Sequence, residues 1–158
     1  MIKHFKKFDI DKIKAEINEL SLSQPFDRQL LIQSVDGTNW HDVRAPYKIH
    51  EDLRDKDFSI PNTPDNFELT RFMKESGIVR TRILKLDQFQ CYTYHKDYGT
   101  RLHLAVDTND QCFFIENYHV FHIPADGYGY EVDTNNYHTA MNCSREPLDR
   151  VHVVGIFR

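Results

Sequence analysis

The chain has 158 residues, 40% of them hydrophobic and 28% charged, with a formal net charge of −4. This length suits one domain, and the hydrophobic fraction is enough for a packed core, so a disordered chain is excluded. The slight acidic excess provides no broad basic field for nucleic acid or anionic lipid, and no apolar run approaches the length of a membrane span.

The three cysteines also indicate a class of protein. They are an odd number and show no C-x-x-C spacing, so neither a disulfide framework nor a thiolate zinc site is predicted. The N-terminal segment turns acidic where a secretory signal would need an apolar stretch. We therefore expect a protein of the reducing cytoplasm, without a membrane or nucleic-acid partner.

The first half of the chain predicts a helix followed by a long loop. Apolar residues recur at steps of three and four from Ile10 to Leu20, which is typical of an amphipathic helix. Asp9 or Asp11 could cap its start. Residues 39–67 are polar and contain three prolines, so we expect a long loop there that could act as a lid.

A second helix is predicted before the pattern changes. Thr63 is its expected cap, Pro64 its first helical residue and Gly77 its stop. Beyond Gly77 the chain consists of short runs rich in Val, Ile, Thr, Tyr and Phe, separated by turn residues. The expected strands are 78–86, 90–94, 101–106, 113–123, 128–132 and 151–157.

Regular spacing of these short strands favours an antiparallel sandwich or a small barrel, the jelly-roll type included. We therefore predict a single α+β domain over residues 1–158. Its N-terminal part, 1–76, would be helical and loop, and would pack against a β core formed by 77–158.

The strongest signal of chemistry is His95-Lys96-Asp97 followed by His138. Residues i and i+2 of a strand point to one face, so His95 and Asp97 could reach the same ion, and His138 from a distant strand would complete the set. Two imidazoles and one carboxylate leave the opposite octahedral positions open, as in non-haem Fe(II) oxygenases. A surface turn in which His95 and Asp97 only form hydrogen bonds is the alternative.

Four further side chains are candidates for binding substrate or co-substrate. Arg150 opens the last strand, and its planar guanidinium could hold a dicarboxylic acid by both oxygens of one carboxylate. Arg80 and Arg82 share one face of their strand; an inward pair could hold an anionic substrate, and an outward pair would be a solvated face. Trp40 could line a pocket, although a lone Trp is most often part of the core.

Six short motifs make the last 60 or so residues similar to a known family. They resemble the 2-oxoglutarate- and Fe(II)-dependent oxygenases of the aspartyl/asparaginyl β-hydroxylase group, and most of all the bacterial proline cis-hydroxylases. In chain order the motifs are HKD (95–97), RLHL (101–104), DTN (107–109), FHI (121–123), HTA (138–140) and RVHV (150–153).

The resemblance implies a double-stranded β-helix, a distorted jelly roll of the cupin-like kind. It implies that the HKD histidine and aspartate, with the histidine of HTA, bind Fe(II). Arg150 would bind the C5 carboxylate of 2-oxoglutarate, and Arg101 and His103 would lie at the co-substrate. The implied activity is hydroxylation of an amino acid, or of an amino-acid side chain in a peptide, with dioxygen. The short link between HKD and RLHL, and the lack of Trp before HTA, argue against free proline as the substrate.

Alternatives remain at this point. In the peptide-hydroxylating branch of the family, His103 would bind iron and Ala105 would stand where a carboxylate is missing; the spacing of Asp97 from His95 favours the full triad. A cupin-like metalloprotein that does not use 2-oxoglutarate, and a metal-free jelly-roll module for binding or structure, are alternatives from other classes.

Overall fold

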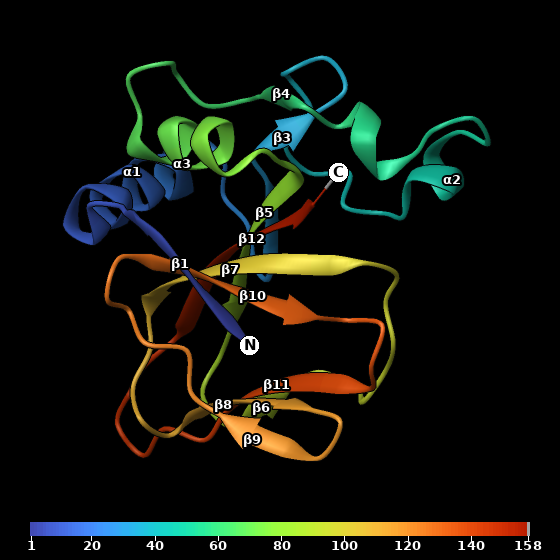
Figure 1. Ribbon diagram of the computed structural model, residues 1–158. Coiled ribbons are helices and arrows are strands. Elements are labelled where there is room, and N and C mark those ends of the chain that lie inside the picture. The colour runs from blue at the N-terminus through green and yellow to red at the C-terminus, as the bar shows by residue number, and fades with distance from the viewer. Residues whose placement is uncertain (158) are drawn as a thin grey trace.

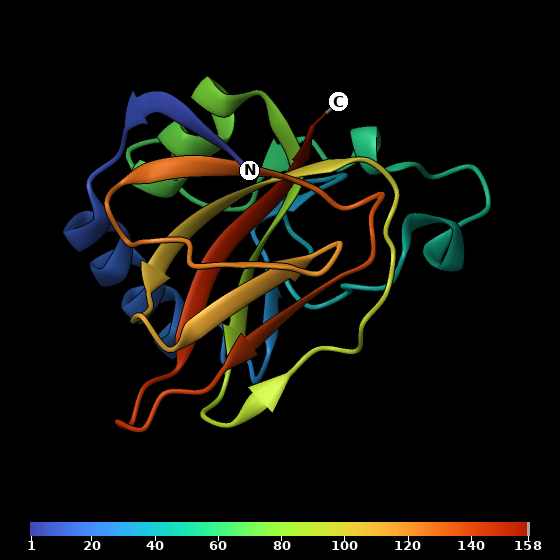
Figure 2. The same cartoon turned by 60° about the horizontal axis from the view of Figure 1, so that its bottom comes forward.

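Strands from both halves of the chain form two antiparallel sheets in the computed structural model, which describes residues 1–157 (Figures 1 and 2). The larger sheet consists, in spatial order, of β1 (Ile2–Lys7), β10 (Tyr128–Asp133), β7 (Thr100–Asp107), β12 (Arg150–Phe157), β5 (Ile78–Leu86) and β2 (Gln29–Leu31). The smaller sheet consists of β6 (Gln90–Cys91), β11 (His138–Asn142), β8 (Cys112–Glu116) and β9 (His119–Phe121).

The remaining elements lie in the first half of the chain. They are α1 (Ile10–Ser23), α2 (Pro46–Ile49), α3 (Glu68–Ser76), the 3₁₀ turn η1 (Asp55–Asp57) and a separate strand pair, β3 (Gln33–Ser34) with β4 (Ile60–Pro61). Helices α1 and α3 lie over the face of the larger sheet that is turned away from the smaller one (Figure 1).

From β5 onward the chain passes repeatedly between the two sheets. β5, β7, β10 and β12 belong to the larger sheet, whereas β6, β8, β9 and β11 belong to the smaller. As a result β12, the last strand, pairs with both β5 and β7. Residues far apart in the sequence therefore meet in the space between the sheets.

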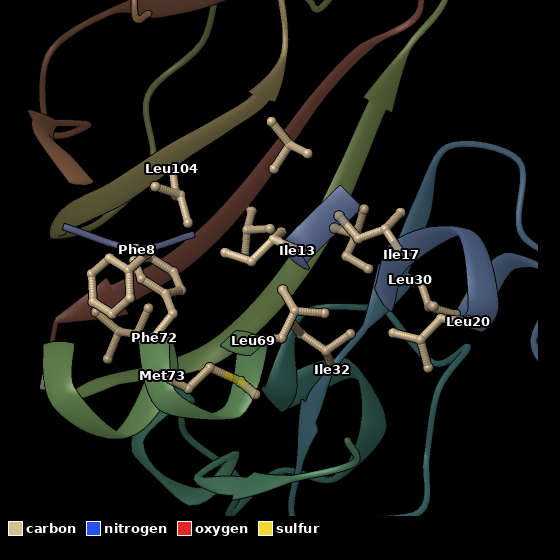
Figure 3. Close-up of a cluster of buried hydrophobic side chains, with 14 of the residues drawn as sticks. Phe8, Ile13, Ile17, Leu20, Leu30, Ile32, Leu69, Phe72, Met73 and Leu104 are labelled. Carbon is tan, nitrogen blue, oxygen red and sulfur yellow. The ribbon is translucent and has the colours of Figure 1, made fainter. Parts of the chain in front are cut away.

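Because side chains alternate along the strands, the larger sheet has one face toward the helices and one face toward the smaller sheet. Outward residues such as Leu104 pack with Ile13 of α1 and Leu69 of α3 in the main hydrophobic cluster (Figure 3). Inward residues such as Ala105 and Tyr130 belong to a second cluster between the sheets. The inward face also carries the polar residues of the site described below.

Two predicted helix boundaries are confirmed. Asp9 caps α1, because its carboxylate accepts a hydrogen bond from the backbone N–H of Lys12 at 3.1 Å. Gly77 ends α3 in the left-handed conformation, with φ of 66°, which glycine adopts without steric cost.

The predicted start of α3 at Thr63 and Pro64 is wrong. The helix begins at Glu68, and Phe67 before it offers no capping side chain. The carboxylate of Glu16, from α1, accepts hydrogen bonds from the backbone N–H of Glu68 at 2.6 Å and of Leu69 at 2.9 Å. A side chain from another helix thus caps α3, which local sequence patterns do not indicate.

The predicted division of the domain is also wrong in part. Residues 1–76 are not only helix and loop, because they supply β1 and β2 to the larger sheet. The expected loop 39–67 contains α2, η1 and β4. The expected strand 113–123 is two strands, because Asn117 and Tyr118 turn the chain with positive φ of 46° and 67°. No helix in the described part of the chain has the length and apolar character that a membrane crossing requires.

Candidate metal centre and its cavity

The structure brings His95, Asp97 and His138 together. Each offers a ligand atom, and these atoms all lie within 4.8 Å of one another. Asp97 Oδ2 is 3.5 Å from His95 Nε2 and 3.7 Å from His138 Nε2. Two imidazole nitrogens and a carboxylate oxygen that surround one point are a donor set for a divalent transition metal, with the remaining positions open.

Backbone hydrogen bonds hold the three residues in place, but His95 and Asp97 do not lie on a regular strand as predicted. His95 lies beyond the end of β6 in an isolated bridge with His138, with N–H to O distances of 3.1 and 2.8 Å. The N–H of Asp97 donates to the carbonyl of Thr134 at 2.9 Å. The segment 95–97 is therefore placed by the β10–β11 connection, and regular i, i+2 strand geometry does not explain the convergence.

Both histidines are held in the tautomer that binds a metal through Nε2. His95 Nδ1 lies 2.6 Å from the carbonyl of Thr93, and His138 Nδ1 lies 3.0 Å from the carbonyl of Asn136. A carbonyl oxygen only accepts hydrogen bonds, so Nδ1 is the donor in each contact, and Nε2 is the ring nitrogen left to face the ion. Such bonds orient the ring of a ligating histidine and raise its basicity.

Asp97 is kept ionised. Burial alone would raise the pKa of its carboxyl group, but contact with His138 and the positive charge of Arg101 outweigh burial and lower it below the usual range. Arg101 Nη2 lies 2.6 Å from Asp97 Oδ2 and fixes the carboxylate toward the two imidazoles. The ionised carboxylate is the form in which an aspartate binds a metal.

A cavity of about 280 Å³ extends from the triad into the space between the sheets. Its charged lining is almost entirely basic: four arginines face one carboxylate, that of Asp97. Both sheets contribute to the wall, and α1 and α3 do not. The basic lining residues are Arg80, Arg82, Arg101 and Arg150.

Arg150 lies in the wall with Tyr92 and two buried histidines nearby. Its side chain has no acidic partner within residues 1–157, its Nη2 contacts His152 Nδ1 at 3.3 Å, and burial lowers its pKa to about 10. The Tyr92 hydroxyl, both ring nitrogens of His103 and Nε2 of His152 are buried without a hydrogen-bond partner in the same range. Unpaired buried polar atoms around a cavity indicate a polar ligand.

Burial and the neighbouring positive charge of Arg150 lower the pKa of His103 and of His152 well below the usual value. Both rings are therefore neutral at pH 7. His103, the alternative iron ligand, packs edgewise on Phe114 and His152, with ring centroids 5.3 and 5.8 Å apart. Phe114 in turn stacks on the ring of His138 at 5.7 Å.

Arg80 and Arg82 both point inward and both are buried. Arg80 has φ of 51°, a strained conformation for a residue other than glycine, and forms an ion pair of 2.7 Å with Asp55. Arg82 Nη1 donates to the side-chain oxygen of Gln29 at 3.0 Å, whereas its Nε is buried without a partner in the described chain. Burial, together with the charges of the other arginines, lowers the pKa of Arg82 to about 9.

Sequence reasoning placed one residue differently and missed several residues of the cavity wall. Trp40 packs against the main core cluster, which is the core alternative noted above. Gln29 and Tyr92 line the cavity and were not predicted. Tyr92 directly follows β6, and its backbone N–H still donates to the carbonyl of Ala140 on β11 at 3.0 Å.

No family model and no curated protein matches this sequence. Among solved structures it is similar to a cupin superfamily protein from Desulfitobacterium hafniense, with 7% identity and a TM-score of 0.40 over 51% of this chain and 69% of that chain. It is also similar to a predicted oxalate decarboxylase from Thermotoga maritima, with 17% identity and a TM-score of 0.39 over 55% and 74% of the two chains. At this level of similarity, function must be argued from the side chains of the site.

Proposed function

We propose that this protein is an Fe(II)- and 2-oxoglutarate-dependent dioxygenase that hydroxylates an amino acid or an amino-acid side chain in a peptide. The observation that carries the proposal is the triad itself, with both histidines locked as Nε2 donors beside an ionised carboxylate. Iron and 2-oxoglutarate, when bound, activate dioxygen for insertion into a C–H bond. The passage of the chain between two antiparallel sheets supports a double-stranded β-helix as the scaffold.

The chain's own residues have separate tasks in this proposal. Arg150 binds the distal carboxylate of the co-substrate through its guanidinium fork, and the Tyr92 hydroxyl donates to the same group. Arg101 orients Asp97. His103 is a neutral donor or acceptor beside the co-substrate. The burial of these groups keeps water away and strengthens each polar contact.

Anaerobic addition of Fe(II) and then 2-oxoglutarate tests the proposal directly. We expect a visible metal-to-ligand charge-transfer band, followed on exposure to air by succinate formation. Iron binding without the band would indicate a metalloprotein that does not use 2-oxoglutarate. Absence of iron binding would indicate a metal-free module, and either result contradicts the proposal.

Two variants separate iron binding from 2-oxoglutarate binding. Asp97→Ala should weaken iron binding by about 100-fold or more, because even residues that only support a metal ligand contribute about 10- to 100-fold. The control is Asp110→Ala, at an exposed turn.

Arg150→Ala should leave iron affinity within about threefold and weaken 2-oxoglutarate binding by about 10- to 100-fold, as expected for a charge-assisted pair. Its control is Arg145→Ala, exposed on the preceding loop.

A further inference from the structure

The four arginines of the cavity differ in whether they have an acidic partner. Arg80 pairs with Asp55 and Arg101 pairs with Asp97. Within residues 1–157, Arg82 and Arg150 form no ion pair, although only 8% and 3% of their surfaces are exposed. A buried charge without a counter-charge is costly, so each of these two guanidiniums is suited to an anion that arrives from solution.

The two unpaired arginines lie at different levels of the larger sheet. In the register of β12 with β5, Arg150 pairs with Leu86, whereas Arg82 pairs with Val154. Positions 150 and 154 on one strand are separated by roughly 13 Å, at about 3.3 Å per residue. Val154 also pairs with His103 on its other side, and the charges of Asp97 and Arg101 act on Arg82. Arg82 is therefore on the side of the cavity toward the metal centre.

One molecule of 2-oxoglutarate does not provide an anionic partner for both Arg82 and Arg150. Its distal carboxylate would be bound by Arg150, and its other carboxylate, with the keto oxygen, would be bound by the metal. Both of its charges are then matched, and the carbon chain between them spans only roughly 6 Å at about 1.5 Å per bond. Arg82 is left without a partner.

We propose that Arg82 binds a carboxylate of the primary substrate, so that the enzyme acts on an acid in preference to its neutral amide. This inference rests on the proposed function. The Nε of Arg82, which has no hydrogen-bond partner within residues 1–157, forms with Nη2 the planar fork that matches a carboxylate, while Gln29 of the edge strand β2 accepts a hydrogen bond from Nη1. Arg80 is held by Asp55 and by the carbonyls of Val43 and Arg44, so it keeps the neighbouring wall rigid.

The size of the cavity limits the kind of acid. At about 280 Å³ it lies just below the range of about 300 to 1,000 Å³ that is usual for ligand pockets. The co-substrate must share this space. A small free amino acid, or a single acidic side chain that enters from a peptide, is therefore the class of substrate that fits.

The test observes Arg82 directly and does not depend on turnover. The protein is loaded with Zn(II), which cannot support the reaction, and is saturated with 2-oxoglutarate. Sodium propionate, and separately propionamide as the neutral match, are then titrated at constant ionic strength. Arginine Nε–H signals are followed in ¹H–¹⁵N spectra, with the Arg82 signal assigned from its loss in Arg82→Lys.

We expect propionate to shift the Arg82 signal saturably and propionamide to leave it unmoved. Calorimetry should give propionate at least tenfold weaker binding to Arg82→Gln, with the exposed control Arg145→Gln unchanged. If the chemical shift of the Arg82 Nε–H signal does not change on addition of propionate, the inference is overturned. An Arg82 signal that moves and saturates on addition of 2-oxoglutarate alone would also overturn it, because Arg82 would then belong to the co-substrate.

The two proposals fail in different ways. If 2-oxoglutarate produces no change at the Arg150 signal, the proposed function fails. A saturable propionate shift at Arg82 in that case would still establish the carboxylate site, in a protein of another activity.

Discussion

At the scale of single residues, Arg80 and Arg82 show how one strand can carry two very different positive charges. They lie two positions apart on β5, and both are buried. Arg80 has an ion pair with Asp55 and two backbone carbonyls as partners. Arg82 has only the neutral side chain of Gln29. The first arginine stabilises the fold, whereas the second is retained at a cost to stability, as is common at functional sites.

This contrast predicts opposite effects of the same substitution. Arg82→Met should raise the free energy of unfolding by about 1 to 3 kcal/mol, because it removes an uncompensated buried charge. Arg80→Met should lower it by a similar amount, because Asp55 and two carbonyls lose their donor. Urea unfolding at pH 7, in a buffer without carboxylate or phosphate, measures both. Equal destabilisation by the two variants would show that Arg82 is not an uncompensated charge.

At the scale of elements, helix α3 depends on helix α1 for its cap. Glu16→Ala leaves the first N–H groups of α3 without an acceptor, and we expect a loss of about 1 to 3 kcal/mol in the free energy of unfolding. Glu16→Gln keeps one acceptor oxygen and should cost less. The matched control is Glu19→Ala, on the exposed side of α1, which should change stability by less than about 0.5 kcal/mol. Denaturant unfolding measures all three, and a cost for Glu16→Ala no larger than the control would contradict this role.

A second element-scale feature lies on the outer side of the metal-binding segments. Tyr94 and Tyr137 each precede a histidine of the triad, and their rings stack with centroids 5.4 Å apart. The ammonium of Lys96 lies 4.7 Å from the ring centroid of Tyr137. Because segment 95–97 is held by few backbone bonds, this cross-strand packing stabilises the position of His95.

Tyr94→Ala should therefore weaken Zn(II) binding by about tenfold, in the range seen when residues that support metal ligands are lost. Tyr94→Phe should restore the affinity, since stacking needs only the ring. Tyr98→Ala serves as the control, because the Tyr98 side chain is 95% exposed. The affinity is measured by competition with a chromophoric chelator. An unchanged affinity in Tyr94→Ala would mean that the backbone bridge is sufficient.

At the scale of the whole molecule, the candidate metal centre lies where the chain crosses between the sheets. His95 and Asp97 precede β7 of the larger sheet, and His138 begins β11 of the smaller one. A bound ion would thus join the segment that leads into β7 to the start of β11. Zn(II) at 100 times its dissociation constant should add about 2.7 kcal/mol of stability and raise the melting temperature by about 5 to 10 °C. Calorimetry with and without Zn(II) measures the shift, which should disappear in His138→Ala and persist in His119→Ala.

The amino-acid sequence by itself was sufficient to predict the β-rich second half, the start of α1 and the stop at Gly77, because these depend on side-chain periodicity and on local backbone preferences. It also singled out His95, Asp97 and His138, and it left open whether Arg82 faces inward or outward. Six short motifs in the same order carried this prediction, whereas the i, i+2 strand geometry expected for residues 95–97 is not the one observed.

Only the tertiary structure decided the rest, because it depends on contacts between segments that are distant in the chain. Glu16 caps a helix that begins 52 positions later, and β1 joins the sheet beside β10. The carbonyls that fix the histidine tautomers are local but depend on the bridge between His95 and His138. Which arginine has a counter-charge and which does not is likewise set by packing, and local patterns carry no information about it.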